Sequence, residues 1–519
     1  MASTEQVLGT WILIAIYASA VLYFVIKGAM GTKSMKDYAV GSMNFSPVFV
    51  GMSLAAAMTS AATFIINPGL IALYGISGVL SFGLFFPVAT MLSLVVLTKS
   101  FRKFGQSVSA VSLASWIGKR YNSNGYSLFI AFLSVLLLTF IVLILVALTK
   151  VFASALNTNE ILTLGAIIIF VFGYMMFGGA NAMVYTNAIQ AGIMLIVAVI
   201  LLVSGFKHFG NGISGFLETL KSIDPVLVKA TNEGSPLFRD FWEIILAQVI
   251  IGAAVVCQPH IITKSLLLKK ESDVNKFLIT AIIVEILFFS VVITGLYARI
   301  EFPDLMANGK VLGNDSIIPT YVIHIFSNGW VAIVVGLFVI LGLIGAGMST
   351  LEGLIQSLST SITNDIINPL FGKRISSDRS YIKINRFVIV LLAVVAFFLS
   401  RHQLISPKLS VAIFAQNGVY AYFSIIFIPI LLGIFGKTVG LMAPLWASIT
   451  ALVTHFGIYY GLPYIVNNNI ASLGYFDKYF VGTIHNPAIA AASAIILSAL
   501  VGLTIYQVNR FKTKSIKAN

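Results

Sequence analysis

Apolar runs of about 20 residues recur along the whole chain, and each is long enough to cross the hydrocarbon core of a bilayer as a helix. The runs lack the period-two alternation of membrane β-strands, and a spanning segment must satisfy its own backbone hydrogen bonds. The composition agrees, because 58% of the 519 residues are hydrophobic and only 10% are charged. The sequence therefore predicts an all-α integral membrane protein, with residues 1–519 forming a single transmembrane domain.

The apolar runs predict about 13 transmembrane helices. The first, at 8–27, is expected to be a retained span and not a cleaved signal, because no basic region precedes it. The predicted spans are 8–27, 46–71, 75–98, 126–153, 160–177, 184–205, 241–262, 277–299, 329–366, 386–401, 408–432, 438–461 and 486–508.

The basic residues predict the orientation of these spans in the membrane. With the N-terminus outside, 22 of the 32 Lys and Arg residues fall on the inside, and the positive-inside rule favours that arrangement. The C-terminus is then cytoplasmic, and the predicted location is the inner (plasma) membrane of a bacterium. The formal net charge of +14 does not indicate a nucleic-acid partner, because the basic residues are dispersed between spans.

Two predicted spans carry sequence features of a broken helix. The stretch SLAAAMTSAATFIINPGLIALYG (53–75) and the stretch AQVIIGAAVVCQPHIITK (247–264) both place polar residues and a proline in mid-span. Alone, each is equally compatible with a Pro-kinked helix packed by small residues. The two spans each open a block of five, which is typical of transporters with five-plus-five inverted repeats. We expect repeats at 46–205 and 241–432, an extra N-terminal helix at 8–27 and two C-terminal helices at 438–508.

Several motifs occur in an order that resembles the solute:sodium symporter family over nearly the whole chain. They are KSMKDYAVG (33–41), AAAMTSAATFIINPG (55–69), FGGANAMVYTNAIQAGIM (177–194), QPHIITK (258–264) and GAGMSTLEGLIQSLSTSITNDI (345–366). The stretches SIDPVLV (222–228) and FPDLMANGKVLGNDSIIPTYV (302–322) are most similar to the pantothenate carriers of that family. The resemblance implies a LeuT-like core of inverted repeats, in agreement with the predicted spans.

The resemblance also implies a sodium site. Ser349 and Thr350 match the hydroxyl pair that holds sodium in the family, and Ala346 would add its carbonyl. Ala56 and Thr59 would add carbonyls at the break in the second span. A hard cation such as sodium prefers oxygen ligands of this kind. The alternative is that both hydroxyls bond to the preceding turn of their own helix.

A carboxylate in the ninth span departs from the family pattern. Of the 18 acidic residues, only Glu285 and Glu352 lie deep in predicted spans, where charge is expensive and usually functional. The sixth span often carries an acid where this chain has Asn187. One hypothesis is that Glu352 and Asn187 form a second cation site or a proton-coupling site. The alternative is a neutral Glu352 that bonds between helices.

In relatives, the second, third, seventh and eleventh spans line the solute pocket. The polar residues of these spans are the candidate solute ligands, although buried amides also commonly pair helix to helix. The candidates are Ser60, Thr63, Asn67, Gln248, Gln416 and Asn417.

The sequence thus predicts a sodium-coupled symporter that moves a small organic solute, with pantothenate or another small organic anion favoured. A proton-coupled carrier or a carrier of a neutral solute, such as proline or a sugar, is the alternative of the same fold. A nutrient sensor or a channel is the alternative of another class. The six histidines lack ligand spacing and no phosphate-binding loop is present, so we expect neither enzymatic activity nor a cofactor, and no metal other than sodium.

Overall fold

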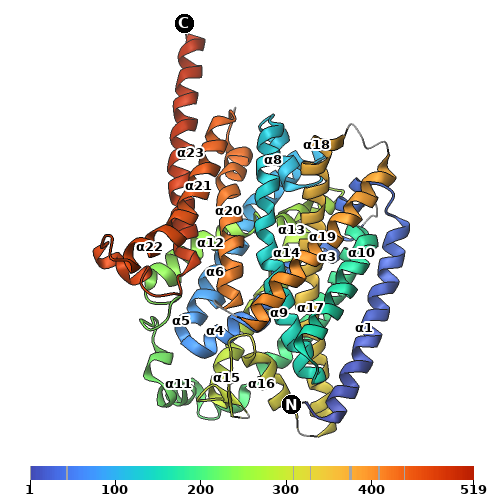
Figure 1. Cartoon of the computed structure of the whole chain (residues 1–519), viewed down its shortest axis with the longest axis vertical. Helices are drawn as coiled ribbons and strands as arrows, with labels where there is room; N and C mark the ends of the chain where they lie inside the picture. The colour runs from blue at the N-terminus through green and yellow to red at the C-terminus, as the bar shows by residue number, and fades with distance from the viewer. Residues whose placement is uncertain are drawn as a thin grey trace.

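The computed structural model describes residues 2–41, 45–307, 309–327, 329–372, 377–406, 410–437 and 439–518, with side chains as far as Phe511. The chain folds into a bundle of long helices, and the N- and C-termini lie at opposite ends of it (Figure 1). The prediction of an all-α membrane protein is therefore confirmed. A two-stranded antiparallel ladder of β1 (Met306–Ala307) and β2 (Lys310–Val311) is a small addition that the sequence did not indicate.

Ten helical stretches of the described chain are long and apolar enough to cross a membrane. They are Thr4–Met30 (α1), Ile76–Ser107 (α5, Ile76–Gly78, and α6, Phe86–Ser107), Asn124–Leu156 (α8, Asn124–Leu133, and α9, Leu138–Leu156), Glu160–Phe209 (mainly α10, Glu160–Ser204), Asp273–Glu301 (α14, Asp273–Ser290, and α15, Thr294–Glu301), Trp330–Phe371 (α17, Trp330–Ser361, and α18, Asn368–Phe371), Asp378–Ile405 (α19), Val411–Phe435 (α20), Met442–Asn467 (α21, Met442–Phe456, and α22, Leu462–Asn467) and Pro487–Phe511 (within α23, Pro487–Ala518).

Two further spans are bent helix pairs, at the two places where the sequence predicts broken helices. The first pair joins α3 (Pro47–Met58) to Ala62–Tyr74, which ends in α4 (Asn67–Tyr74), at an angle of 52°. The second joins Trp242–Val255, which ends in α12 (Ala247–Val255), to Pro259–Leu267, which begins with α13 (Pro259–Ile262), at 55°. We call the two halves of each pair its arms.

The predicted spans 160–177 and 184–205 both lie in α10, which non-helical backbone divides at Gly179. This residue has φ +55°, a conformation that favours glycine. An added Cβ would also lie 2.9 Å from the Tyr38 carbonyl oxygen, so the close approach of α2 (Met35–Val40) requires the missing side chain. With α10 counted as two spans, every predicted span has a counterpart, although residues 408, 409 and 438 at the starts of two of them lie outside the described residues.

Three short helices lie in segments that the sequence analysis treated as connections. They are α7 (Leu113–Arg120), α11 (Gly212–Ile223) and α16 (Ile317–Ile325). Ser112 caps the first of these through a reciprocal capping box with Ser115, which satisfies backbone donors that the helix start leaves free. Figure 1 shows α11 and α16 at the N-terminal end of the bundle.

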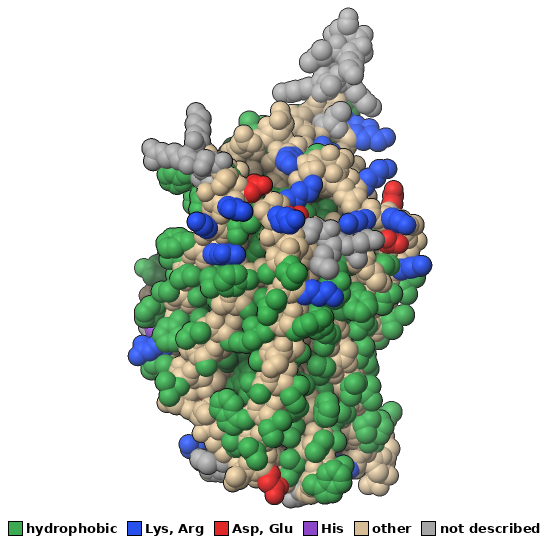
Figure 2. All heavy atoms as spheres, turned by 90° about the vertical axis from the view of Figure 1, so that its right-hand side faces the viewer, with side chains coloured by type: hydrophobic (Ala, Val, Ile, Leu, Met, Phe, Trp, Pro, Cys, Tyr) green, Lys and Arg blue, Asp and Glu red, His purple; other side chains and the backbone are tan. Residues whose placement is uncertain are grey.

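The middle of the bundle contains α17 and α20, whose residues are mostly buried. Large apolar side chains of α1, α6, α14 and α19 are exposed, as expected for helices that face lipid. Figure 2 shows a wide hydrophobic surface, with Lys and Arg side chains gathered over the end from which the C-terminal helix projects. This arrangement places the buried helix α17 where its polar residues meet both bent pairs.

Candidate functional site

The hydroxyl pair of α17 lies against the end of α3. Ser349 Oγ donates to the Ala56 carbonyl oxygen at 2.7 Å and to the Ala346 carbonyl oxygen at 3.1 Å. Thr350 Oγ1 donates to the Ala57 carbonyl oxygen at 3.0 Å, and its bond to Ala346 is longer, at 3.5 Å. Both hydroxyls are fully buried. Bonding to the preceding turn therefore accounts for only part of their contacts, because each also reaches across to the first bent pair.

The break in the first bent pair starts at Thr59. Its backbone is non-helical, with φ −95° and ψ 86°, and its hydroxyl donates to the Ala55 carbonyl oxygen. The Thr63 amide, which would close the next helical turn on Thr59, instead donates to the Ser60 carbonyl. The Thr59 carbonyl is therefore outside the hydrogen-bond ladder of both arms and free to serve as a ligand.

Glu352 lies one turn further along α17 and is completely buried. Three donors from α10 surround its carboxylate: Tyr174 OH at 2.6 Å, Thr186 Oγ1 at 2.6 Å and Gln190 Nε2 at 3.3 Å. The hydrogen bonds to both carboxylate oxygens stabilise the ionised form, whereas complete burial favours the neutral acid.

The structure places Asn187 beside this cluster but bonds it elsewhere. Its Nδ2 donates to the Ser349 carbonyl oxygen at 3.3 Å. The amide oxygens Asn187 Oδ1 and Gln190 Oε1 are buried and lack a hydrogen-bond partner within the described part of the chain. A buried acceptor without a donor is costly, and a cation is one group that would satisfy it.

A cavity opens at the breaks of the two bent pairs. Four of the six candidate solute ligands line it: Ser60, Thr63, Asn67 and Gln416. Aromatic side chains from α9, α14 and α20 complete the wall, namely Phe140, Phe289 and Tyr420. A largely apolar wall with a few polar groups is typical of a site for a small organic molecule.

The other two candidates, Gln248 and Asn417, lie outside this lining. Asn417 donates to Tyr460 OH at 2.8 Å, and its Oδ1 lies 3.0 Å from His455 Nε2, so it joins α20 to α21 and the segment that follows. Gln248 is buried in α12. Asn417 fits the alternative reading of buried amides as helix-pairing groups, whereas the side-chain oxygen of Gln248 is buried without a hydrogen-bond partner in the described residues.

Three polar residues of the lining were not among the candidates, namely Thr90 of α6, Gln258 and His260. Gln258 and His260 stand at the break of the second bent pair and face the cavity. Both ring nitrogens of His260 and the side-chain oxygen of Gln258 are buried without a partner in the described residues. The sequence did contain a signal that Gln258 and His260 line the cavity, because they flank Pro259 and unwound segments at membrane depth line cavities.

Comparison with known proteins places these features in a family. A family model described as the sodium:solute symporter family matches residues 38–451. A sodium/pantothenate symporter of Escherichia coli is 31% identical over 55% of this chain and 58% of its own length, so the match spans little more than half of that relative. A sodium/pantothenate symporter of Haemophilus influenzae is 27% identical over 66% of this chain and 68% of its own length.

A solved structure supports the fold. The substrate-bound outward-open state of a sodium-coupled sialic acid symporter superposes with a TM-score of 0.73, at 17% identity, over 96% of this chain and 97% of its own. Identity this low establishes the architecture alone. The LeuT-like fold that the sequence predicts is thereby confirmed.

Proposed function

Because the chain belongs to the sodium:solute symporter family, we propose that it imports a small organic anion, with pantothenate as the first candidate, by sodium-coupled symport. Sodium and a small solute are the transported species, and the protein is a multi-pass membrane transporter and not an enzyme. The observation that carries the proposal is the contact of Ser349 and Thr350 with the backbone at the break of the first bent pair.

In this proposal sodium binds between α17 and α3. The hydroxyl oxygens of Ser349 and Thr350 and the carbonyls of Ala56, Thr59 and Ala346 supply its ligands, which are the oxygens a hard cation prefers. The two hydroxyl protons now point at carbonyls, and in the sodium-bound form they would turn away so that the oxygen lone pairs face the ion.

This site would couple sodium to solute through the break. The ion ties α17 to α3, while the break and the other arm of the same pair place Ser60, Thr63 and Asn67 at the cavity. An arrangement that separates α3 from α17 would dissolve the sodium site and reshape the solute site together. Coupling is then a difference in sodium affinity between two states of the protein.

We propose an anion with further polar groups as the solute. His260, Gln258, Ser60 and Gln416 supply hydrogen-bonding groups, and two relatives that are 31% and 27% identical are named for pantothenate, a carboxylate with hydroxyl and amide groups. None of the lining residues is Lys or Arg, so the carboxylate would bind to His260 and to backbone donors at the unwound arms.

We propose Glu352, with Asn187, as a second cation site or a proton site. The three donors on the carboxylate and the unpartnered oxygens Asn187 Oδ1 and Gln190 Oε1 support it. We also propose that the N-terminus is outside and the C-terminus cytoplasmic, which makes α3 and Pro259–Leu267 the cytoplasmic arms of the two pairs. The basic end of Figure 2 would then face the cytoplasm.

The decisive experiment is uptake of a labelled panel into proteoliposomes: pantothenate, short monocarboxylates, proline and a sugar, each with and without an inward sodium gradient. We expect accumulation of pantothenate or another carboxylate only with sodium. Accumulation of proline or a sugar would replace the anion by a neutral solute. Accumulation driven by a proton gradient would move the coupling role to Glu352, and equilibration without accumulation would indicate a channel.

A further inference from the structure

Lys264 is a buried cation on the cytoplasmic arm of the second bent pair. It lies directly after α13, and only 2% of the residue is exposed. Its ammonium group donates to the Ser53 carbonyl oxygen at 3.0 Å and to Ser53 Oγ at 2.7 Å. Ser53 belongs to α3, so Lys264 joins the cytoplasmic arms of the two pairs one turn before Ala57, which accepts from Thr350.

The bonds to Ser53 leave the charge of Lys264 without an acid in contact. No ion pair forms at Lys264 among the residues that the structure describes. The acid whose charge acts on it is Glu352. Burial of a charge without a carboxylate partner is expensive. The buried position of the Lys264 ammonium group therefore requires a stabilising contribution other than packing.

The two charges sit on elements that can move relative to each other. Glu352 is fixed by α10 through Tyr174, Thr186 and Gln190. Lys264 is carried by the arm of the second pair, which packs closely on α17. A Cβ added at Gly353 would lie 3.3 Å from His260 Cβ, so the residue beside Glu352 is in contact with that arm.

We propose that Lys264 is a tethered counter-charge for Glu352 that helps to expel the coupling cation toward the cytoplasm. In the present arrangement Lys264 bonds to Ser53 and leaves the carboxylate available to an ion. When the cytoplasmic arms separate, Lys264 loses Ser53, and its ammonium group then pairs with Glu352, the acid whose charge acts on it. The inference rests on the proposed cation site at Glu352.

The physical reason is competition between two cations for one buried carboxylate. A metal ion and an ammonium group that share one low-dielectric site repel each other, so the approach of Lys264 lowers the affinity of the site for sodium. In the state that opens to the cytoplasm, an internal cation replaces the transported one. The carboxylate then remains neutralised while the empty carrier returns, which avoids an unpaired buried charge.

The test uses purified full-length protein with neutral substitutions of Lys264. Lys264→Gln and Lys264→Met remove the charge, and the apolar Met variant provides a second folded sample if the Gln variant is unstable. We expect the sodium concentration that half-stabilises the protein in thermal unfolding to fall about tenfold, which corresponds to removal of a repulsion of roughly 1.4 kcal/mol. Net solute uptake should slow, whereas exchange of labelled for unlabelled solute with sodium on both sides should continue.

Two further variants isolate the charge of Lys264. Lys270→Gln removes an exposed cation from the segment after the same arm and should match the wild type. In a protein that already carries Glu352→Gln, Lys264→Gln should no longer change the sodium dependence of thermal unfolding. Unchanged sodium dependence in the folded neutral variants, or an equal change with and without Glu352, would overturn the proposal.

The result is separable from a failure of the proposed function. If the wild-type protein shows no sodium-driven uptake, sodium symport itself is wrong. If uptake is sodium-driven and Ser349→Ala weakens it, while both neutral Lys264 variants bind sodium as the wild type does, then only the role of Lys264 is wrong.

Discussion

Neighbouring polar residues of one membrane helix can have different surroundings, as Gln416 and Asn417 show. They are neighbours on α20, and Gln416 lines the cavity while Asn417 bonds to Tyr460 and His455. Successive residues of a helix point about 100° apart, which lets Gln416 face the cavity while Asn417 faces α21. The sequence identified both as polar residues of the right span, but the direction of each depends on the rotation of α20 in the bundle.

The role of Ser349 is tested by Ser349→Ala. The variant loses one sodium ligand, and we expect the apparent sodium affinity to fall at least about tenfold, as is usual when the surroundings of a metal ion are disturbed. Solute affinity at saturating sodium should change much less. Uptake at a series of sodium and solute concentrations measures both quantities.

Ser357→Ala is the matched control for this experiment. It removes a buried hydroxyl from the same helix, and within the described part of the chain Ser357 Oγ bonds only to the preceding turn, at the Leu354 carbonyl. We expect the control to retain the sodium dependence of the wild type. Equal losses of sodium and solute affinity in Ser349→Ala would contradict a specific sodium role.

Glu352→Gln tests the second cation site. The amide replaces one acceptor oxygen by a donor facing Tyr174 or Thr186, which should cost about 1–3 kcal/mol in folding free energy. If Glu352 binds a cation, the variant loses the ligand charge that holds this ion. The number of charges moved per solute should then decrease by about one. If Glu352 carries a proton, the pH dependence of uptake should disappear instead.

The control for this variant is Glu285→Gln. Glu285 is an equally buried acid on α14, but neither of its oxygens has a hydrogen-bond partner in the described residues. We expect the control to keep the charge-to-solute ratio of the wild type. A Glu352→Gln protein with unchanged ratio and unchanged pH dependence would leave Glu352 as a neutral group between helices.

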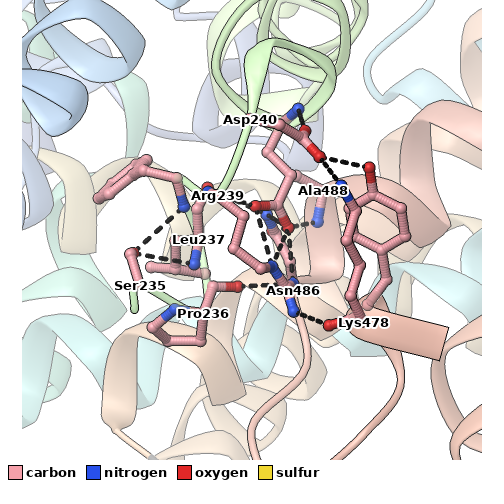
Figure 3. A network of polar contacts seen from close by, with 11 residues as sticks. Ser235, Pro236, Leu237, Arg239, Asp240, Lys478, Asn486 and Ala488 are labelled. Atoms are coloured by element: carbon pink, nitrogen blue, oxygen red, sulfur yellow. Dashed lines mark hydrogen bonds and ion pairs between the residues drawn. The ribbon is translucent and has the colours of Figure 1, made fainter. Parts of the chain in front are cut away.

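At the scale of elements, a polar network connects the outer arm of the second bent pair to the segment before α23 (Figure 3). Arg239 bonds to Glu243 at 2.7 Å and to the Lys478 carbonyl, and Lys478 pairs with Asp240 at 2.6 Å. Asn486 donates to Glu243 at 3.1 Å. The residues come from two segments more than 200 positions apart, so the network could not be predicted from the sequence.

This network should depend on pH. Burial alone would raise the pKa of Asp240, but hydrogen bonds from Lys478 and Tyr479 outweigh it and hold the pKa below 3.8. Because the pKa of Asp240 is depressed in the folded protein, its ionised form stabilises the fold at pH values above its pKa in the unfolded chain. That stabilisation is lost as the pH falls through its pKa in the folded protein. Asp240→Asn should therefore lower the unfolding temperature at pH 7, by an amount corresponding to about 0.5–1 kcal/mol for a partly exposed pair.

The difference between Asp240→Asn and the wild type should shrink as the pH falls below about 4, where the wild-type carboxylate also loses its charge. Thermal unfolding in detergent over a pH series measures this. Asp304→Asn removes an exposed carboxylate near β1, outside the network, and should unfold as the wild type does. A constant difference between Asp240→Asn and the wild type at all pH values would contradict the ionic origin of the effect.

For the whole molecule, the number of spans, both breaks and the family could be predicted because lipid imposes strong local rules. A span must be long, apolar and helical, and a break is allowed only next to a cavity. The contacts of Glu352 could not be predicted, because they depend on how α10 and α17 pack across about 160 to 180 residues of sequence. The same holds for the position of Lys264 against Ser53.

The ion pairs of the described chain lie on the side that the sequence predicts to be external. Four ion pairs join Lys or Arg to an acid in the described residues, and all four involve residues predicted to be external. These are Lys150–Glu160, Lys207–Glu301, Arg239–Glu243 and Lys478–Asp240. Acids therefore neutralise part of the external basic charge.

Labelling of single cysteines in intact cells tests this orientation. Ser222→Cys places a thiol on exposed α11, and Lys270→Cys places one at the opposite end, while native Cys257 is buried and should give little background. A membrane-impermeant maleimide should label the first variant in intact cells and the second only after permeabilisation. The reversed pattern would put α3 and Pro259–Leu267 outside and contradict the proposed orientation. Sodium moving down its gradient would still carry solute inward, but it would enter from the face at which Lys264 is proposed to expel it.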